Sequence, residues 1–136
     1  MDTSKRGAFC NLLVRNKPSI LIIDDDAAIL HAFTRIFQKN GFSVTTAAKG
    51  SEAIEKLRTS RFDVALVDLR LPDMEGTELF PAIDKASPNA VKIMLTGSAH
   101  LAGNLEGADA LLGKPVNLGK LLSVIDSKLK SRYIEA

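Results

Sequence analysis

Two short apolar runs of this chain end in aspartate, and this feature constrains the fold more than any other. Ile20–Ile23 is followed directly by Asp24 and Asp25. Val64–Val67 is followed by Asp68. In an open parallel α/β sheet the carboxyl ends of the strands line the crevice where ligands bind. We therefore expect Asp24, Asp25 and Asp68 to lie within reach of one another at one edge of a sheet.

The ends of two further apolar runs complete a set of reactive groups. Val91–Leu95 ends in Thr96 and Gly97, and Leu111–Gly113 ends in Lys114. Carboxylates gathered at such an edge repel one another unless a cation lies between them, and a hard divalent ion such as Mg²⁺ takes oxygen ligands. Acids, a hydroxyl and an amine at four strand ends together predict a magnesium-dependent phosphoryl site.

Strand and helix signals alternate from residue 19 onward, which predicts an α/β fold. Buried strands are expected at residues 19–23, 42–46, 64–67, 91–95 and 109–112. Apolar residues at helical spacing follow the strands, with Asp26 as the N-terminal cap of the first helix and Asn117 as that of the last. A helix at 77–86 contains Pro81, which should distort or shorten it. Alternating units of this kind imply a parallel sheet with helices on both faces.

We expect the crossover from the fourth to the fifth strand to be irregular. It spans residues 97–108, and a parallel crossover needs about a dozen residues even when tight. After a turn at each end, residues 99–106 allow roughly two helical turns, and Gly103 weakens their middle. The expected fold is therefore a (βα)5 doubly wound parallel sheet with a shortened or irregular fourth helix.

The composition excludes several classes of function. Of 136 residues, 46% are hydrophobic and 25% are charged, which is ordinary for a globular domain. No apolar stretch approaches the length that spans a bilayer. The first 19 residues carry four basic and one acidic residue, and the remainder carries 14 basic and 15 acidic residues. Because the folded part has no basic stripe, nucleic-acid binding is not expected.

One domain is expected at residues 19–131, between two tails. The N-terminal tail, 1–18, has no sustained periodicity and no signal-peptide cleavage site. The C-terminal tail is expected at 132–136. Cys10 is the only cysteine, so an intrachain disulfide is excluded and a cytoplasmic location is favoured.

These strand ends resemble those of the receiver domains of two-component response regulators, over residues 19 to about 130. The family has an acidic pair after strand 1, a phosphoacceptor aspartate after strand 3, Ser or Thr after strand 4 and Lys-Pro after strand 5. The matching positions here are Asp24 with Asp25, Asp68, Thr96 and Lys114 with Pro115. The resemblance implies the flavodoxin-like strand order 2-1-3-4-5.

The resemblance also implies how the acidic residues act. Asp68 would be the phosphoacceptor, whose carboxylate attacks phosphorus and forms an acyl phosphate. Asp25 and Asp68 would bind Mg²⁺ directly, and Asp24 would hold a metal-bound water. The backbone carbonyl of Arg70 would supply a further oxygen ligand. Magnesium keeps several waters and uses few carboxylates, which suits this sparse set.

The remaining strand-end residues would contact the phosphoryl group. Lys114 would pair with Asp68 at rest and with a phosphoryl oxygen afterwards, a change that suits a compact ammonium. The bond from Lys114 to Pro115 is usually cis in the family. Thr96 would donate its hydroxyl to the phosphoryl group, with the backbone N–H of Gly97 beside it.

Three features depart from the family pattern. Position 111 is often an aromatic residue that turns inward on phosphorylation, and here it is Leu111. The span from Thr96 to Lys114 is short for the family. Arg70 and Ser98 occupy variable positions that flank the path of hydrolytic water. We therefore expect a non-standard output surface, with any homodimer made away from the face of the fourth crossover.

The expected function is that of a receiver in a phosphorelay. It would take a phosphoryl group from a sensor histidine kinase or a histidine phosphotransfer protein and signal to, or relay to, a downstream protein. No external substrate, nucleic acid or membrane is expected. Two alternatives stay open. One is a phosphorylation-independent interaction module, which Leu111 favours. The other is a small magnesium phosphohydrolase, which would need a general acid where this chain has Arg70.

Overall fold

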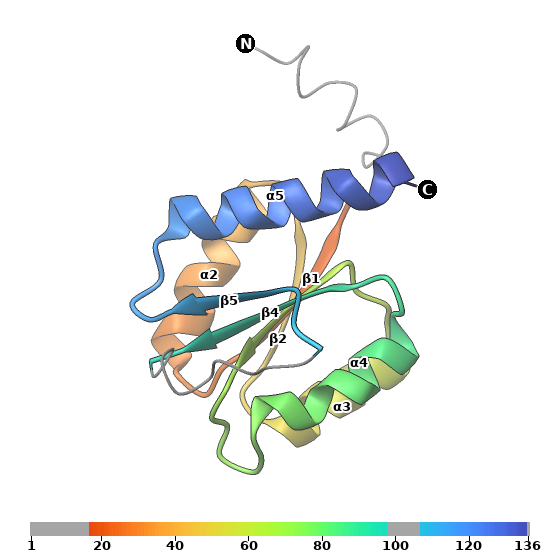
Figure 1. Ribbon diagram of the computed structural model, residues 1–136. Coiled ribbons are helices and arrows are strands. Elements are labelled where there is room, and N and C mark those ends of the chain that lie inside the picture. The colour runs from red at the N-terminus through yellow and green to blue at the C-terminus, as the bar shows by residue number, and fades with distance from the viewer. Residues whose placement is uncertain (1–16, 98–106, 136) are drawn as a thin grey trace.

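A parallel sheet of five strands organises the fold (Figure 1). The structure is a computed structural model that describes residues 17–97 and 107–135. The strands are β1 (Ser19–Ile23), β2 (Ser43–Ala47), β3 (Val64–Asp68), β4 (Val91–Thr96) and β5 (Ala110–Gly113). Across the sheet their order is β2-β1-β3-β4-β5, and every neighbouring pair is parallel. This confirms the predicted strand order, and each strand lies within one residue of its predicted position at either end.

Helices cover both faces of the sheet, as a doubly wound fold requires. They are α2 (Ala27–Lys39), α3 (Gly50–Thr59), the 3-10 helix η1 (Gly76–Leu79), α4 (Phe80–Ala86) and α5 (Leu118–Glu135). In Figure 1, α2 and α5 lie on one face, and α3 and α4 lie on the other. No described helix is both long enough and apolar enough to cross a membrane.

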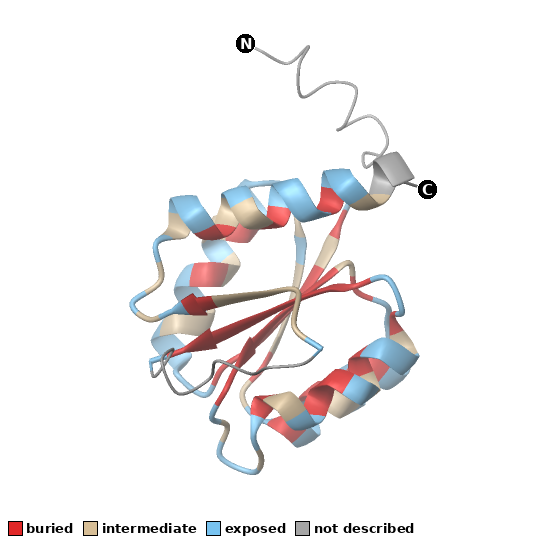
Figure 2. Ribbon diagram, viewed as in Figure 1, coloured by how far each residue is buried: buried red, intermediate tan, exposed pale blue. Residues whose placement is uncertain are grey.

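The core consists of two apolar layers separated by the sheet. Successive residues of a strand point to opposite faces. In β3, Val64 and Leu66 therefore pack under α2 and α5, whereas Ala65 and Val67 pack under α3 and α4. Every residue of β3 and β4 is buried (Figure 2). Burial on both faces explains why these strands are nearly continuous apolar runs in the sequence.

The N-terminal end of α2 is the one that the sequence predicts. The Asp26 carboxylate accepts hydrogen bonds from the backbone N–H of Ala28 at 2.9 Å and of Ile29 at 3.3 Å, so Asp26 caps the helix. The helix ends at its C-cap, Asn40, and Gly41 follows with a φ of 89°. That left-handed conformation suits glycine, which has no Cβ.

Pro81 divides the helix that was predicted at residues 77–86. A 3-10 turn, η1, comes first, and α4 then begins at Phe80 with Pro81 in its first turn. Proline has no N–H to donate, and the first turn of a helix does not need one. The predicted shortening is therefore confirmed.

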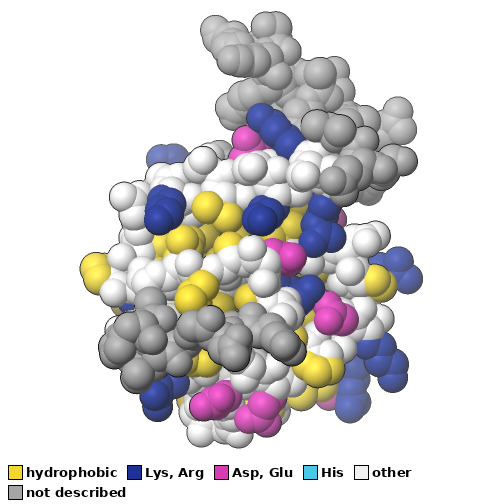
Figure 3. Space-filling model, in the orientation of Figure 1, with side chains coloured by type: hydrophobic (Ala, Val, Ile, Leu, Met, Phe, Trp, Pro, Cys, Tyr) yellow, Lys and Arg dark blue, Asp and Glu magenta, His cyan; other side chains and the backbone are white. Residues whose placement is uncertain are grey.

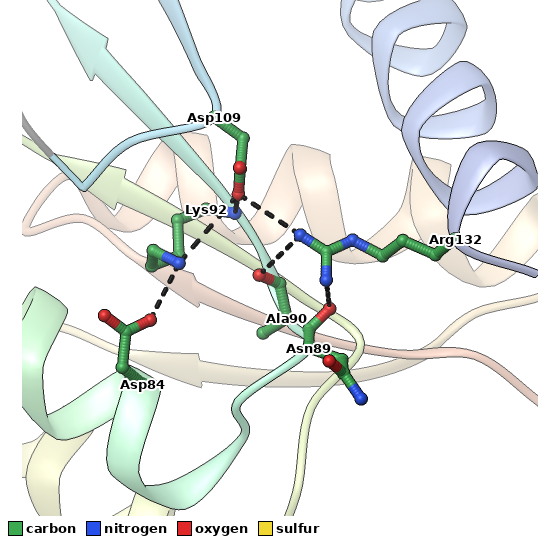
Figure 4. Close-up of polar contacts among 6 residues, drawn as sticks. All are labelled: Asp84, Asn89, Ala90, Lys92, Asp109 and Arg132. Carbon is green, nitrogen blue, oxygen red and sulfur yellow. Dashed lines mark hydrogen bonds and ion pairs between the residues drawn. The ribbon is translucent and has the colours of Figure 1, made fainter. Parts of the chain in front are cut away.

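Charged residues join several elements at the end of the sheet opposite the acidic strand ends (Figure 4). Lys92, near the start of β4, is only 8% exposed. Its Nζ lies 2.8 Å from Oδ1 of Asp84 on α4 and 4.0 Å from Oδ2 of Asp109, which precedes β5. The same Asp109 oxygen lies 3.6 Å from Nη2 of Arg132 on α5. We refer to Asp84, Lys92, Asp109 and Arg132 as the basal charge network.

Several sequence expectations concern the two ends of the chain and the fourth crossover. Residues 1–16 and 98–106 lie outside the described residues, and so do most of the predicted N-terminal tail and the predicted irregular fourth helix. The predicted C-terminal tail is helical as far as Glu135, and Arg132 within it contacts the basal charge network. Leu111 lies in β5, half-buried, and packs against the apolar layer under α3 and α4. On the face drawn in Figure 3, basic and acidic side chains of the described residues are interspersed.

Candidate functional site

The carboxylates predicted to gather at one edge of the sheet lie together in the structure. Asp24 follows β1, Asp68 ends β3, and these strands pair with Ile23 opposite Val67. One carboxylate oxygen from each of Asp24, Asp25 and Asp68 lies within 4.8 Å of the other two. Asp24 is 1% exposed and Asp68 is 8% exposed. Parallel strand pairing thus forces buried carboxylates against each other.

Lys114 lies between the two buried carboxylates. Its Nζ is 3.0 Å from Oδ2 of Asp24 and 3.3 Å from Oδ2 of Asp68. The resemblance implied a pairing with Asp68, and the structure adds a shorter one with Asp24. The backbone N–H of Lys114 donates to the carbonyl of Thr96 at 2.8 Å, which attaches the end of β5 to the end of β4. The peptide bond between Lys114 and Pro115 is cis.

The residues after β4 and β3 border the same carboxylates. Thr96 is the last residue of β4 and is buried, and Gly97 follows it in an exposed turn. The backbone of Arg70 makes a hydrogen bond to the Asp68 carboxyl group, and the rest of Arg70 is largely exposed. The backbone N–H of Leu69 donates to the carbonyl of Leu95 at 3.0 Å. Every residue that the sequence predicted for the site therefore lies at this one edge.

Burial and the charge of Asp24 oppose the ammonium of Lys114 in setting the pKa of Asp68. Burial raises the pKa of the Asp68 carboxyl group, and the negative charge of Asp24 raises it further. The ammonium of Lys114 and the Arg70 backbone lower it, but they do not cancel the rise. For Lys114, burial lowers the pKa, and the hydrogen bond and charge of Asp24, followed by those of Asp68, outweigh that effect and raise it. Burial is thus the main reason that the pKa of Asp68 stays above its ordinary value although Lys114 lies beside it.

The donor set fits a hard divalent cation such as Mg²⁺. The three carboxylates come from the ends of β1 and β3, and their oxygens are close enough to share one ion. Magnesium binds through a few carboxylates and retains several waters, so the exposure of Asp25 is compatible with it. Burial is the main cause of the raised pKa of Asp68, and the negative charge of Asp24 adds to it; a bound cation would neutralise that charge.

Sequence reasoning missed Gly76, which packs directly beneath the predicted phosphoacceptor. A Cβ on Gly76 would lie 2.2 Å from the backbone carbonyl oxygen of Asp68 and 2.7 Å from Cγ1 of Val67. The Gly76 N–H donates to the carbonyl of Leu69 at 2.6 Å. The requirement for glycine at this position could be found only from this close approach.

Comparison with known proteins assigns the chain to a family. The family model of the response regulator receiver domain matches residues 20–126. The chain belongs to this family. It is a receiver domain of two-component signal transduction, and its strand order is the one that the resemblance implied.

Three similar proteins illustrate this membership. The receiver domain is 40% identical to a CheY-like receiver domain protein from Methanospirillum hungatei JF-1, with a TM-score of 0.80 and coverage of 89% of this chain and 100% of that one. It is 27% identical to the response regulator TrrA of Thermotoga maritima in complex with Mg²⁺ and BeF, with a TM-score of 0.74 and coverage of 82% and 98%. It is 32% identical to the transcriptional regulatory protein GlrR of Escherichia coli K12, over 85% of this chain and 27% of GlrR.

The chain is shorter than the curated relatives that it matches. It spans 27% of each of the first two relatives and about half of each of the next three. The shared part is therefore the receiver domain.

Proposed function

We propose that Asp68 is the phosphoacceptor of this receiver domain. The observation that supports the proposal is the convergence of Asp68 with two other aspartates and Lys114 at the carboxyl edge of the sheet. Asp68 is the aspartate that ends β3, and its carboxyl group contacts both the lysine and the Arg70 backbone. A carboxylate held among polar groups at a ligand-binding edge is suited to nucleophilic attack.

The phosphoryl group would come from a phosphohistidine on a sensor histidine kinase or a histidine phosphotransfer protein. An ionised oxygen of Asp68 attacks phosphorus, the bond from phosphorus to the histidine nitrogen breaks, and that nitrogen takes up a proton as it leaves. The product on Asp68 is an acyl phosphate. Lys114, which now contacts Asp68, would move to a phosphoryl oxygen, and the Thr96 hydroxyl and the Gly97 N–H would donate to the phosphoryl group.

Asp24, Asp25, Asp68 and the Arg70 carbonyl are the proposed magnesium ligands, with Asp24 acting through a water. Mg²⁺, when bound, would neutralise charge on the phosphoryl oxygens and on the gathered carboxylates. The chain's own residues orient the nucleophile and hold it between the lysine and the metal ligands. The domain would thus assist its own phosphorylation and dephosphorylation rather than turn over an external substrate, and it would then signal to a downstream protein.

Labelling of one residue tests the proposal. With Mg²⁺ and acetyl phosphate as a small acyl-phosphate donor, intact mass should show one added phosphoryl group on the wild type. Asp68→Asn should abolish this gain while keeping the fold, because the change is nearly isosteric. Asp126→Asn, at an exposed position on α5, is the matched control and should be labelled like the wild type. Equal labelling of Asp68→Asn and wild type would refute the assignment.

A further inference from the structure

The N-terminus of α3 is capped by a residue far from it in the sequence. Asp73, in the loop between β3 and η1, accepts hydrogen bonds on both carboxylate oxygens. One comes from the backbone N–H of Gly50 at 2.8 Å and the other from that of Ser51 at 2.9 Å. Lys49, at the N-cap position itself, makes no capping hydrogen bond with its side chain. The two bonds to Asp73 therefore satisfy helix donors that local residues leave open.

The loop that carries Asp73 is a short hairpin that begins at the site. The N–H of Leu71 donates to the carbonyl of Met74 at 3.0 Å, and the N–H of Gly76 donates to the carbonyl of Leu69 at 2.6 Å. Asp73 lies at the tip between these arms. The side chain of Met74 packs on Gly50, where a Cβ would lie 2.4 Å from its sulfur. The tip of the hairpin is thus attached to α3 by two hydrogen bonds and one close apolar contact.

The start of α3 is in turn attached to β1. The backbone N–H of Asp24 donates to the carbonyl of Ala47, at the end of β2, at 3.1 Å. Only two residues separate Ala47 from Gly50, the first residue of α3. A continuous route therefore runs from Asp24 through the start of α3 and Asp73 to the loop after Asp68. It joins the two acid-bearing strand ends independently of the pairing between β1 and β3.

We propose that Asp73 is a positioning residue for phosphoryl acceptance. Its attachment to α3 holds the loop after Asp68 in place, and with it the Arg70 backbone that contacts the Asp68 carboxyl group. The orientation of Asp68 toward Asp24 and Asp25 then depends on Asp73, which touches none of the reacting atoms. This inference rests on the proposed role of Asp68 and extends it to the loop that follows.

The test separates positioning from helix stability. Asp73→Ala removes the attachment, and Asp73→Asn keeps one acceptor oxygen. Lys49→Ser places a local cap on α3, since serine at that extended N-cap position can accept from the first turn. The double variant Lys49→Ser with Asp73→Ala therefore restores the helix end without restoring the attachment. Lys49→Ser alone and Asp126→Ala, at an exposed site on α5, serve as controls.

Two measurements are made on each variant. The first is the rate of phosphorylation by acetyl phosphate with Mg²⁺, and the second is amide hydrogen exchange of residues 69–76 in metal-free protein. We expect Asp73→Ala to lower the rate about tenfold, because small displacements of a reacting group are costly and the hairpin keeps its internal bonds. Exchange in 69–76 should become faster. Asp73→Asn should recover part of both effects.

The double variant decides the outcome. We expect it to regain the melting temperature of the wild type while its phosphorylation stays slow and its loop exchange stays fast. If it regains the rate as well, or if Asp73→Ala is phosphorylated as fast as the wild type, Asp73 acts only on α3 and the inference is wrong. Failure of the wild type itself to be labelled would instead refute the proposed function, so the two failures are distinguishable.

Discussion

Nζ of Lys114 lies 3.0 Å from Oδ2 of Asp24, although the two residues are 90 positions apart in the chain. The other oxygen of Asp24 accepts the backbone N–H of Asp26 at 2.9 Å. Asp24 is almost completely buried, so these two partners replace the water that it loses. The same lysine lies 3.3 Å from Asp68. Lys114 is thus the cationic partner that both buried carboxylates share in this structure.

Removal of this lysine should destabilise the metal-free protein. Lys114→Ala leaves Asp24 and Asp68 buried without the ammonium, and breaking a fully buried pair in this way costs roughly 3–5 kcal/mol. Since the Lys114 side chain is 24% exposed, we expect a smaller loss, roughly 1–3 kcal/mol at neutral pH. Urea denaturation with a chelator present measures it, with the exposed Lys120→Ala on α5 as control. Addition of Mg²⁺ should stabilise the variant more than the wild type. Unchanged stability of Lys114→Ala would contradict the shared ion pair.

Because the pKa of Asp68 is raised in the folded state, removing its charge should stabilise the folded protein, by an amount that depends on pH. Folding raises the pKa above the ordinary value of 3.8, first through burial and then through Asp24, so the folded state disfavours the ionised form. This cost is absent at pH values well below 3.8, grows as the pH rises to the folded pKa, and is constant above it. Metal-free Asp68→Asn should therefore have a higher melting temperature than the wild type at pH 7, and the difference should shrink in acid. Asp126→Asn should show no such trend, and a lower melting temperature for Asp68→Asn at pH 7 would reverse the predicted sign.

The strand ends of this fold could be predicted because their signals are local. An apolar run followed by an acid, a threonine or a lysine identifies both the strand and the edge to which its last residue belongs. Because parallel strands end at the same edge of a sheet, Asp24, Asp68 and Lys114 can be predicted to lie together even when no loop conformation is known. The caps at Asp26 and Asn117 were predictable for the same reason, since a cap contacts backbone groups within three residues of itself.

The contacts that were not predicted join residues that are distant in the sequence and that the loops bring together. Asp73 caps a helix 22 residues earlier in the chain, and nothing near Gly50 or Asp73 signals that contact. Lys92 lies in a run that the sequence predicted only as apolar, and its partner Asp84 is supplied by α4. The requirement for glycine at position 76 depends on its distance from Asp68. Each of these contacts requires tertiary structure, which periodicity and capping rules do not supply.

Gly76→Ala should disturb the fold and the site together. The added Cβ would meet the Asp68 carbonyl oxygen at 2.2 Å, and both groups belong to backbone that cannot move independently. Overpacking of this kind typically costs about 1–3 kcal/mol. Gly97→Ala is the control for stability, because among the described residues no atom beyond its chain neighbours lies within 4 Å of a Cβ there. Denaturant unfolding should show a loss for Gly76→Ala and little change for Gly97→Ala. Comparable stability of the two variants would mean that the loop moves away from Asp68 at little cost.

The last prediction concerns the attachment of α5 to the sheet. Arg132 donates to the backbone carbonyl of Asn89 and, at 3.3 Å, to that of Ala90, and it also pairs with Asp109 (Figure 4). These contacts lie at the basal charge network, far along α5 from Asn117, the residue that caps its start. Arg132 is therefore expected to hold the final turns of α5 against the loop before β4.

Arg132→Ala should lower the free energy of unfolding by about 1–2 kcal/mol, because charged donors to two carbonyls are lost while the half-buried ion pair with Asp109, at 3.6 Å, contributes little. Amide exchange should become faster in the last turns of α5 and stay unchanged at Lys114. Lys128→Ala, an exposed lysine one turn earlier, is the matched control. Arg132→Lys should recover only part of the loss, since an ammonium lacks the planar fork that reaches two carbonyls. If Arg132→Ala and Lys128→Ala behave alike, the last turns of α5 do not depend on this contact.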